Sequence, residues 1–177
     1  MTSRTSITGW GHSKFGRLNE PDVTALIGSV VPEALTHAHV EPSEVDGIFV
    51  GVYNNGFSDQ DFQASLVSLS MPEFQHTPAM RVENACGTGS AALYAACDFI
   101  DSGRGDVALV IGAEKMTAVD TPRAGEILLS GCYRPEESNV TGGFAGVFAG
   151  IARATPNATE IRARQWPPSP PRITTTA

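Results

Sequence analysis

The chain has 177 residues and a mass of 18.6 kDa, and its 19 acidic and 12 basic residues give a net charge of −7. An acidic chain without a basic face is not typical of proteins that bind nucleic acids or anionic membranes. No stretch approaches the roughly 18 apolar residues of a membrane span, and the N-terminus has no apolar segment typical of a secretion signal. Three cysteines (Cys86, Cys97 and Cys132) are too few for a disulfide framework. We therefore expect a reduced, cytoplasmic protein.

Hydrophobic periodicity predicts strands that alternate with helices along most of the chain. The predicted elements are a strand over 7–10, a helix over 23–38, a strand over 45–52, a helix from about 59 to 69, a strand over 79–85, a helix over 90–100 and a strand over 107–112. Pro32 lies inside the first helical pattern and should kink or shorten that helix. This alternation is typical of an α/β fold with a mostly parallel sheet between two layers of helices.

The C-terminal part of the chain follows a different pattern. Residues 117–138 carry turn and polar signals and are expected to form a loop region, and residues 142–154 look like the start of another helix. Residues 1–154 hold 18 acidic and 9 basic side chains (18 − 9, net −9), whereas residues 155–177 hold one acidic and three basic (3 − 1, net +2). Five of the 12 prolines lie in this last segment. We therefore expect a domain over 1–154 and a disordered tail over 155–177.

The segment 82–92 places Cys86 between a predicted strand and a predicted helix. A thiol at a helix N-terminus lies near unpaired N–H groups and the positive end of the helix dipole, and both stabilise a thiolate. The same N–H groups can bind the oxyanion of a tetrahedral intermediate. The position therefore favours a nucleophile for acyl transfer. The alternative is a buried structural cysteine, because unpaired cysteines are often buried.

A second interpretation of the same segment is a dinucleotide-binding loop. Residues 87–92 match the pattern G-x-G-x-x-A between a strand and a helix. However, Glu83 and Asn84 interrupt the strand before it, and neither Asp106 nor Glu114 stands at a convincing spacing for the ribose-binding acid. We consider this interpretation the weaker one.

Two motifs carry a family resemblance. The segments 83–92 (ENACGTGSAA) and 106–117 (DVALVIGAEKMT), together with 102–103, 7–17, 45–47 and 50–51, resemble the N-terminal half of a thiolase. The similarity is greatest to sterol-carrier-protein-type thiolases, often labelled acetyl-CoA acetyltransferases, and covers about residues 5–154. The sequence Gly87-Thr88-Gly89 is a mild variant of the family pattern.

The resemblance implies a fold and a role. It implies one half of the duplicated thiolase fold, with a mixed, mostly parallel five-stranded sheet flanked by helices. It assigns Cys86 as the catalytic nucleophile that takes an acyl group from acyl-CoA for Claisen condensation or thiolysis, a reaction of lipid metabolism. It implies coenzyme A thioesters as substrates, no permanently bound cofactor, no metal, and either a homodimer or a partner chain that supplies the C-terminal half.

In this family the general base and a second cysteine come from the C-terminal half. The histidines at 12, 37, 39 and 76 are poor substitutes, because they fall in turns or on an exposed helix face. Cys97 is expected to pack within its helix, and Cys132 does not match the second cysteine of the family. Glu114 and Lys115 could form a salt bridge or serve a function, and we favour a structural role.

Three hypotheses remain for the chain as a whole. The first is a thiolase-type domain, incomplete alone, whose tail over 155–177 is read from a shifted frame, because shifted codons for its Pro-Ser-Pro and Thr runs would suit the family's continuation. The second is a ketoacyl-synthase-like condensing enzyme, which the segment Glu114-Lys115-Met116 disfavours. The third is a non-catalytic fragment or binding subunit.

Overall fold

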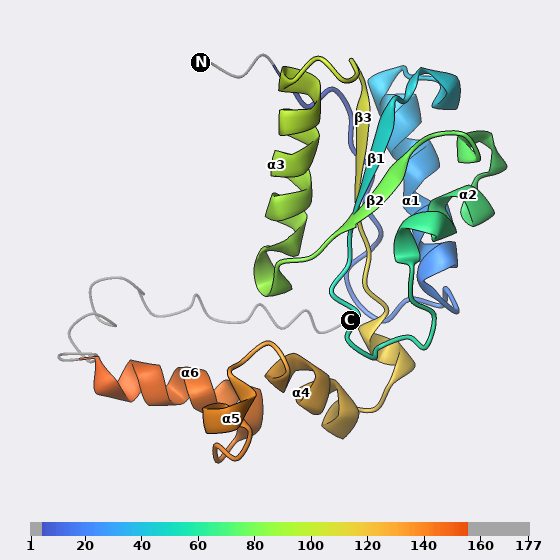
Figure 1. Ribbon diagram of the computed structural model, residues 1–177. Helices are drawn as coiled ribbons and strands as arrows, with labels where there is room; N and C mark the ends of the chain where they lie inside the picture. Colours follow the sequence, from blue (N-terminus) through green and yellow to red (C-terminus); the bar gives the residue numbers. More distant parts are fainter. Residues whose placement is uncertain (1–4, 156–177) are drawn as a thin grey trace, which may run out of the picture. The chain divides into compact units, whose positions relative to one another are not determined.

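The computed structural model describes residues 5–155 (Figure 1). The chain divides after Ile127 into two compact units. The first unit contains α1 (Val23–Ala38), η1 (Pro42–Glu44), β1 (Gly47–Gly51), η2 (Gln63–Ser65), α2 (Leu66–Ser70), η3 (Pro72–Phe74), β2 (Ala79–Val82), η4 (Ala85–Gly87), α3 (Thr88–Asp101), β3 (Ala108–Gly112) and η5 (Met116–Ala118). No helix in the described range is long and apolar enough to cross a membrane.

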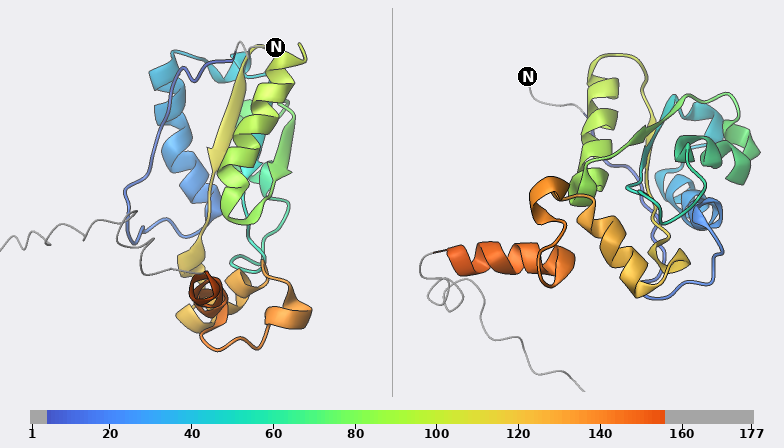
Figure 2. Two further views of the ribbon diagram at one scale, coloured as in Figure 1. Left: turned by 90° about the vertical axis from the view of Figure 1, so that its left-hand side faces the viewer. Right: turned by 60° about the horizontal axis from the view of Figure 1, so that its bottom comes forward.

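The first unit is a three-layer α/β structure around a small parallel sheet. Its strands lie in the order β2-β1-β3, and both pairings are parallel. Figure 2 (left) shows α1 on one side of the sheet and α3 on the other. The α/β class and the mostly parallel sheet are confirmed, but the prediction of five mixed strands is wrong, because residues 5–155 contain three strands and all are parallel.

The expected strand over 7–10 is one source of this difference. These residues form no strand and instead run against α1. A Cβ atom on Gly9 would lie 2.5 Å from the backbone nitrogen of Ala38, and one on Gly11 would lie 2.4 Å from the carbonyl oxygen of Val30. The two glycines therefore allow a contact with the helix backbone, which keeps this segment out of the sheet.

Helix α1 is stabilised at both ends and along one face. Asp22 caps its N-terminus by accepting the N–H of Ala25 at 2.8 Å. His39 ends it in the left-handed conformation at φ 54°. The helix runs through Pro32 to Ala38 and is not shortened there, because its apolar stripe is anchored in the core on both sides of the proline.

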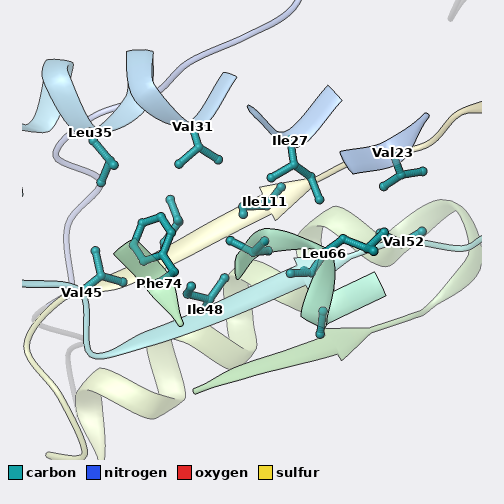
Figure 3. Close-up of a cluster of buried hydrophobic side chains, with 14 residues drawn as sticks. Val23, Ile27, Val31, Leu35, Val45, Ile48, Val52, Leu66, Phe74 and Ile111 are labelled. Atoms are coloured by element: carbon teal, nitrogen blue, oxygen red, sulfur yellow. The ribbon is translucent and has the colours of Figure 1, made fainter. Parts of the chain in front are cut away.

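The core fills both faces of the sheet. The larger cluster joins α1, α2 and one face of the strands (Figure 3), and its members include Val23, Ile27, Val31, Leu35, Val45, Ile48, Leu66, Phe74 and Ile111. On the other face, Phe49 packs with Ala92 and Ala96 of α3. Because β1 is buried along its whole length, it is the central element of the domain.

The region beyond β3 is more helical than the sequence indicates. Residues 117–138, expected to form a loop region, include α4 (Thr121–Leu129) and α5 (Arg134–Glu137). The predicted helix over 142–154 is confirmed as α6 (Gly143–Ala154), where Phe144 and Phe148 stack edge to face at 5.0 Å. Except for Thr155, the tail to which the disorder and frame-shift hypotheses apply lies outside the described residues.

Candidate active site

The three strands end together at one edge of the sheet. Gly51 at the end of β1 pairs with Val82 of β2 and with Gly112 of β3. The loops that follow the strands therefore begin side by side. In open α/β sheets this carboxyl edge is where ligands bind.

Cys86 lies in the turn between β2 and α3, four residues beyond Val82. The turn is the short helix η4, and it begins at Ala85, whose φ of 44° is in the left-handed region. Only a closely constrained turn keeps a non-glycine residue in that conformation. Cys86 is exposed, so the alternative of a buried structural cysteine is wrong.

Hydrogen bonds brace this turn from both sides of Cys86. The N–H of Asn84 donates to Oγ1 of Thr88 at 2.8 Å, and the same hydroxyl donates to the carbonyl oxygen of Ala85 at 2.7 Å. Glu83 accepts the N–H of Ala85. Thr88 is buried, and its methyl group would lie 3.1 Å from a Cβ on Gly51. The turn is therefore fixed against the end of the central strand.

The start of α3 is open around Cys86. Its N-cap residue, Gly87, provides no side-chain hydrogen bond, so no cap side chain occupies the first-turn N–H groups. A Cβ on Gly89 would meet no atom within 4 Å, and Ser90 is exposed. The site therefore combines an accessible sulfur, a helix N-terminus and small neighbours, which suits attack on a carbonyl carbon and stabilisation of the resulting oxyanion.

A polar network beside this turn joins the three strand ends, and the sequence analysis did not predict it. Oε2 of Glu114 accepts the N–H groups of Tyr53 at 3.0 Å and Asn54 at 3.1 Å. Arg81 donates to the carbonyl oxygens of Val52 at 3.1 Å and Tyr53 at 2.7 Å, and forms a 2.6 Å ion pair with the carboxylate of Asp61. Burial raises the pKa of Glu114, while the two N–H donors and Arg81 oppose that rise. The motif around Glu114 was the only sequence signal for this network.

Glu114 and Lys115 each bind a different partner. Lys115 is buried and donates to the carbonyl oxygen of Leu18 at 3.2 Å. The ion pairs found among residues 5–155 are Arg81–Asp61 and Arg123–Glu126, so the salt bridge considered between Glu114 and Lys115 is wrong. The two side chains instead tie the loop after β3 to two other segments.

Within the described residues 5–155, which include all four histidines, none forms a hydrogen bond to Cys86. His37 accepts the N–H of Trp10 at 3.3 Å, and His39 ends α1. His76 precedes the amino end of β2, whereas Cys86 follows its carboxyl end. His12 is exposed and contacts the ring of Phe15 at 4.8 Å. The first unit thus brings no imidazole to the sulfur.

The other cysteines belong to other elements of the chain. Cys97 is half-buried on α3, three helical turns after Cys86, and Cys132 is half-buried in the second unit. Within residues 5–155 no cluster of three His, Cys, Asp or Glu side chains could hold a metal ion.

Comparison with protein families gives a match over most of the chain. The model of the thiolase N-terminal domain matches residues 2–146. The chain is 38% identical over 115 residues to an acetyl-CoA acetyltransferase of Methanocaldococcus jannaschii, covering 64% of this chain and 29% of that protein. It is 30% identical over 149 residues to the acetyl-CoA acetyltransferase of Methanothermobacter thermautotrophicus, covering 84% of this chain and 38% of that protein.

A human protein and a solved structure extend the comparison. Human sterol carrier protein 2 is 35% identical over 117 residues, 64% of this chain and 21% of that protein. The crystal structure of 3-oxoacyl-[acyl-carrier-protein] synthase III from Aquifex aeolicus superposes with a TM-score of 0.51 at 29% identity, covering 59% of this chain and 34% of that chain. The chain therefore spans less than two fifths of the length of these relatives.

Proposed function

The chain belongs to the thiolase family, whose N-terminal domain it contains, and we propose that Cys86 accepts an acyl group from an acyl-coenzyme A thioester. The thiolate of Cys86 attacks the thioester carbonyl, forms a new carbon–sulfur bond and expels coenzyme A as its thiolate, which takes up a proton. The product is an acyl-enzyme. The observation that carries this proposal is the exposed sulfur in the braced turn before α3.

The proposal is limited to the acylation step. Condensation or thiolysis also requires a base beside the acyl-enzyme, and within residues 5–155 no histidine forms a hydrogen bond to Cys86. In the full reaction that base would come from the C-terminal half of the thiolase fold. This half would be supplied either by the subunits of a homodimer or by a separate partner chain. A cytoplasmic setting is part of the proposal, because the three cysteines of the sequence are too few for a disulfide framework.

The experiment is acyl transfer to the purified chain, read by mass spectrometry of the intact protein and of its peptides. Incubation with acetyl-CoA should add one acetyl group to the peptide that contains Cys86, and Cys86→Ser should abolish that thioester. Cys97→Ser is the matched control and should label normally. Iodoacetamide shows separately whether the Cys86 sulfur is reactive. A folded protein that iodoacetamide alkylates at Cys86 but acetyl-CoA leaves unlabelled would refute the proposal.

A ketoacyl-synthase-like function is the second candidate, favoured by the similarity to the acyl-carrier-protein synthase structure. The same labelling experiment separates the two candidates when the acyl group is presented on acyl carrier protein. Labelling from acyl-CoA and not from acyl carrier protein supports the thiolase assignment. The opposite preference supports the synthase.

A further inference from the structure

We propose that a cavity at the carboxyl edge of the sheet, beside the end of β3, binds a phosphate group. The cavity has a volume of about 240 Å³, much more than the about 10–15 Å³ that one water molecule needs. Two segments far apart in the chain line it, within residues 13–18 and 112–117, together with Leu26 and Val30 of α1. Its lining includes no residue of the turn around Cys86, so this cavity is separate from the proposed acyl-transfer site.

Lys115 brings a positive charge to this cavity that no carboxylate of the described chain neutralises. Its side chain lines the cavity, yet the residue is only 9% exposed. Among residues 5–155 it forms no ion pair. An ammonium group has three N–H donors, and within these residues its one acceptor is the carbonyl oxygen of Leu18 at 3.2 Å. Because a buried lysine is rarely left unpaired, its remaining donors indicate a site for an anion.

Two hydroxyl groups join Lys115 in the lining. Ser13 and Thr117 both border the cavity, and neither hydroxyl has a hydrogen-bond partner within the described residues. Ser13 comes from the N-terminal segment, whereas Lys115 and Thr117 come from the segment after β3. Three donors around one cavity suit a tetrahedral oxyanion, whose oxygens are strong hydrogen-bond acceptors.

Glu114 is the one acid among the described residues of the lining, and its carboxylate is occupied elsewhere. Its Oε2 accepts the N–H groups of Tyr53 at 3.0 Å and Asn54 at 3.1 Å. Burial also raises the pKa of this carboxyl group, which favours its neutral form. Glu114 therefore repels an anion in the cavity less than an exposed carboxylate would.

The N-terminal side of the cavity is positive, although the chain as a whole has a net charge of −7. Residues 5–19 contain no Asp or Glu and carry Lys14 and Arg17, both exposed. Positive side chains near a cavity attract anions from solution. The lining residues Gly16 and Thr117 are exposed, so an anion can reach the cavity from the solvent.

The experiment uses the fact that the chain contains two lysines, Lys14 and Lys115. In protein made with isotope-labelled lysine, the side-chain NMR signal of Lys115 should shift and saturate as inorganic phosphate is added, with a Kd below about 10 mM. Chloride and acetate at the same ionic strength should not shift it. AMP identifies the source of the phosphate group, because tighter binding than inorganic phosphate indicates a phosphate ester and weaker binding indicates the free ion. None of these readouts depends on acylation of Cys86.

Variants test the donors by calorimetric titration with inorganic phosphate. Lys115→Met removes the charge but keeps an unbranched side chain, and it should weaken binding at least about tenfold. Lys14→Met is the matched control at an exposed lysine and should weaken binding less than about fivefold. The double variant Ser13→Ala, Thr117→Val keeps Lys115 and should weaken binding about tenfold, which decides the matter if Lys115→Met does not fold.

Three results would overturn the proposal. The first is a Lys115 signal that phosphate does not shift. The second is an equal shift with chloride or acetate, which would indicate a general effect of anions. The third is normal phosphate binding by folded Lys115→Met or, where that variant does not fold, by the double variant.

Discussion

The backbone N–H of Tyr53 donates a 3.0 Å hydrogen bond to Oε2 of Glu114, which lies 61 residues later in the chain. The N–H of Asn54 donates to the same oxygen at 3.1 Å. One carboxylate thus ties the loop after β1 to the loop after β3. The carboxyl edge of the sheet, where the turn of Cys86 also lies, depends on this contact for its shape.

The substitution Glu114→Gln should remove a pH-dependent part of the stability. Burial raises the pKa of Glu114 in the folded state above its ordinary value of 4.5. The stability that this protonation contributes is therefore complete below the ordinary pKa and is lost as the pH rises through the raised folded value. The glutamine oxygen can accept both N–H groups and does not titrate.

Urea unfolding between about pH 4 and pH 7 measures this effect. The free energy of unfolding of the variant should improve relative to the natural chain as the pH rises. Glu126→Gln, at an exposed ion pair with Arg123, is the control and should not change the profile. Parallel profiles for the natural chain and Glu114→Gln would contradict the prediction.

Asp46 should show the opposite pH dependence. Its Oδ2 accepts the N–H groups of Asp106 at 2.8 Å and Val107 at 3.1 Å, and these bonds lower the pKa of this exposed carboxylate below 3.8. The stability that the ionised Asp46 carboxylate contributes is present above its ordinary pKa. It is lost as the pH falls through the lowered pKa of the folded state. Thermal unfolding at pH values around 3.8 should therefore show that the advantage over Asp46→Asn shrinks on acidification. Asp98→Asn, on the exposed part of α3, should show no such trend.

The left-handed turn before Cys86 predicts that Ala85→Gly stabilises the domain. Alanine at φ 44° costs about 1–2 kcal/mol, and glycine avoids that cost while losing about 0.5–1 kcal/mol through unfolded-state entropy. The net gain in the free energy of unfolding should be about 0.5–1 kcal/mol. Ala91→Gly, inside α3, should instead lose about 1 kcal/mol. Equal losses in denaturant titrations of both variants would rule out a left-handed turn at Ala85.

Packing of the N-terminal segment on α1 predicts that Gly9→Ala is damaging. The added methyl group would lie 2.5 Å from the nitrogen of Ala38 and 2.7 Å from the carbonyl oxygen of Ala34, and backbone atoms cannot move aside easily. We expect a loss of about 1–3 kcal/mol in the free energy of unfolding. Gly89→Ala has open space at its Cβ and a helical backbone, so it should gain about 0.5–1 kcal/mol. A drop in melting temperature for Gly89→Ala alone would contradict the described packing.

Hydrophobic periodicity was enough to predict the helices and strands that are buried along one side or along their whole length. The stripe of α1 and the apolar runs of β1 and β3 are confirmed close to their predicted bounds. The segment 7–10 has a strand-like composition, but its conformation depends on glycine contacts with α1 that no local pattern contains. Helix α4 was missed because its sequence carries proline, glycine and polar residues.

The position of Cys86 in the candidate site could be predicted from the sequence, but the contacts of Glu114 and Arg81 could not. A cysteine followed by Gly-Thr-Gly between a strand and a helix indicates a reactive position, and the structure places Cys86 at that junction. The role of Glu114 depends on the N–H groups of residues about 60 positions earlier, so only the folded chain brings these groups together. Arg81 joins the same loop for the same reason.

The strand order has a consequence for synthesis of the chain on the ribosome. Strand β1 is made first but lies in the centre, between two strands that come later in the chain. Roughly 60 residues separate β1 from β3, and the ribosome adds about 5–20 residues per second. The edge of β1 that pairs with β3 therefore stays unpaired for about 3–12 seconds. During that interval Ile48, Phe49 and Val50 form an incomplete apolar strand. Nascent chains should therefore be most prone to aggregation, and most dependent on chaperones, before residue 112 leaves the exit tunnel.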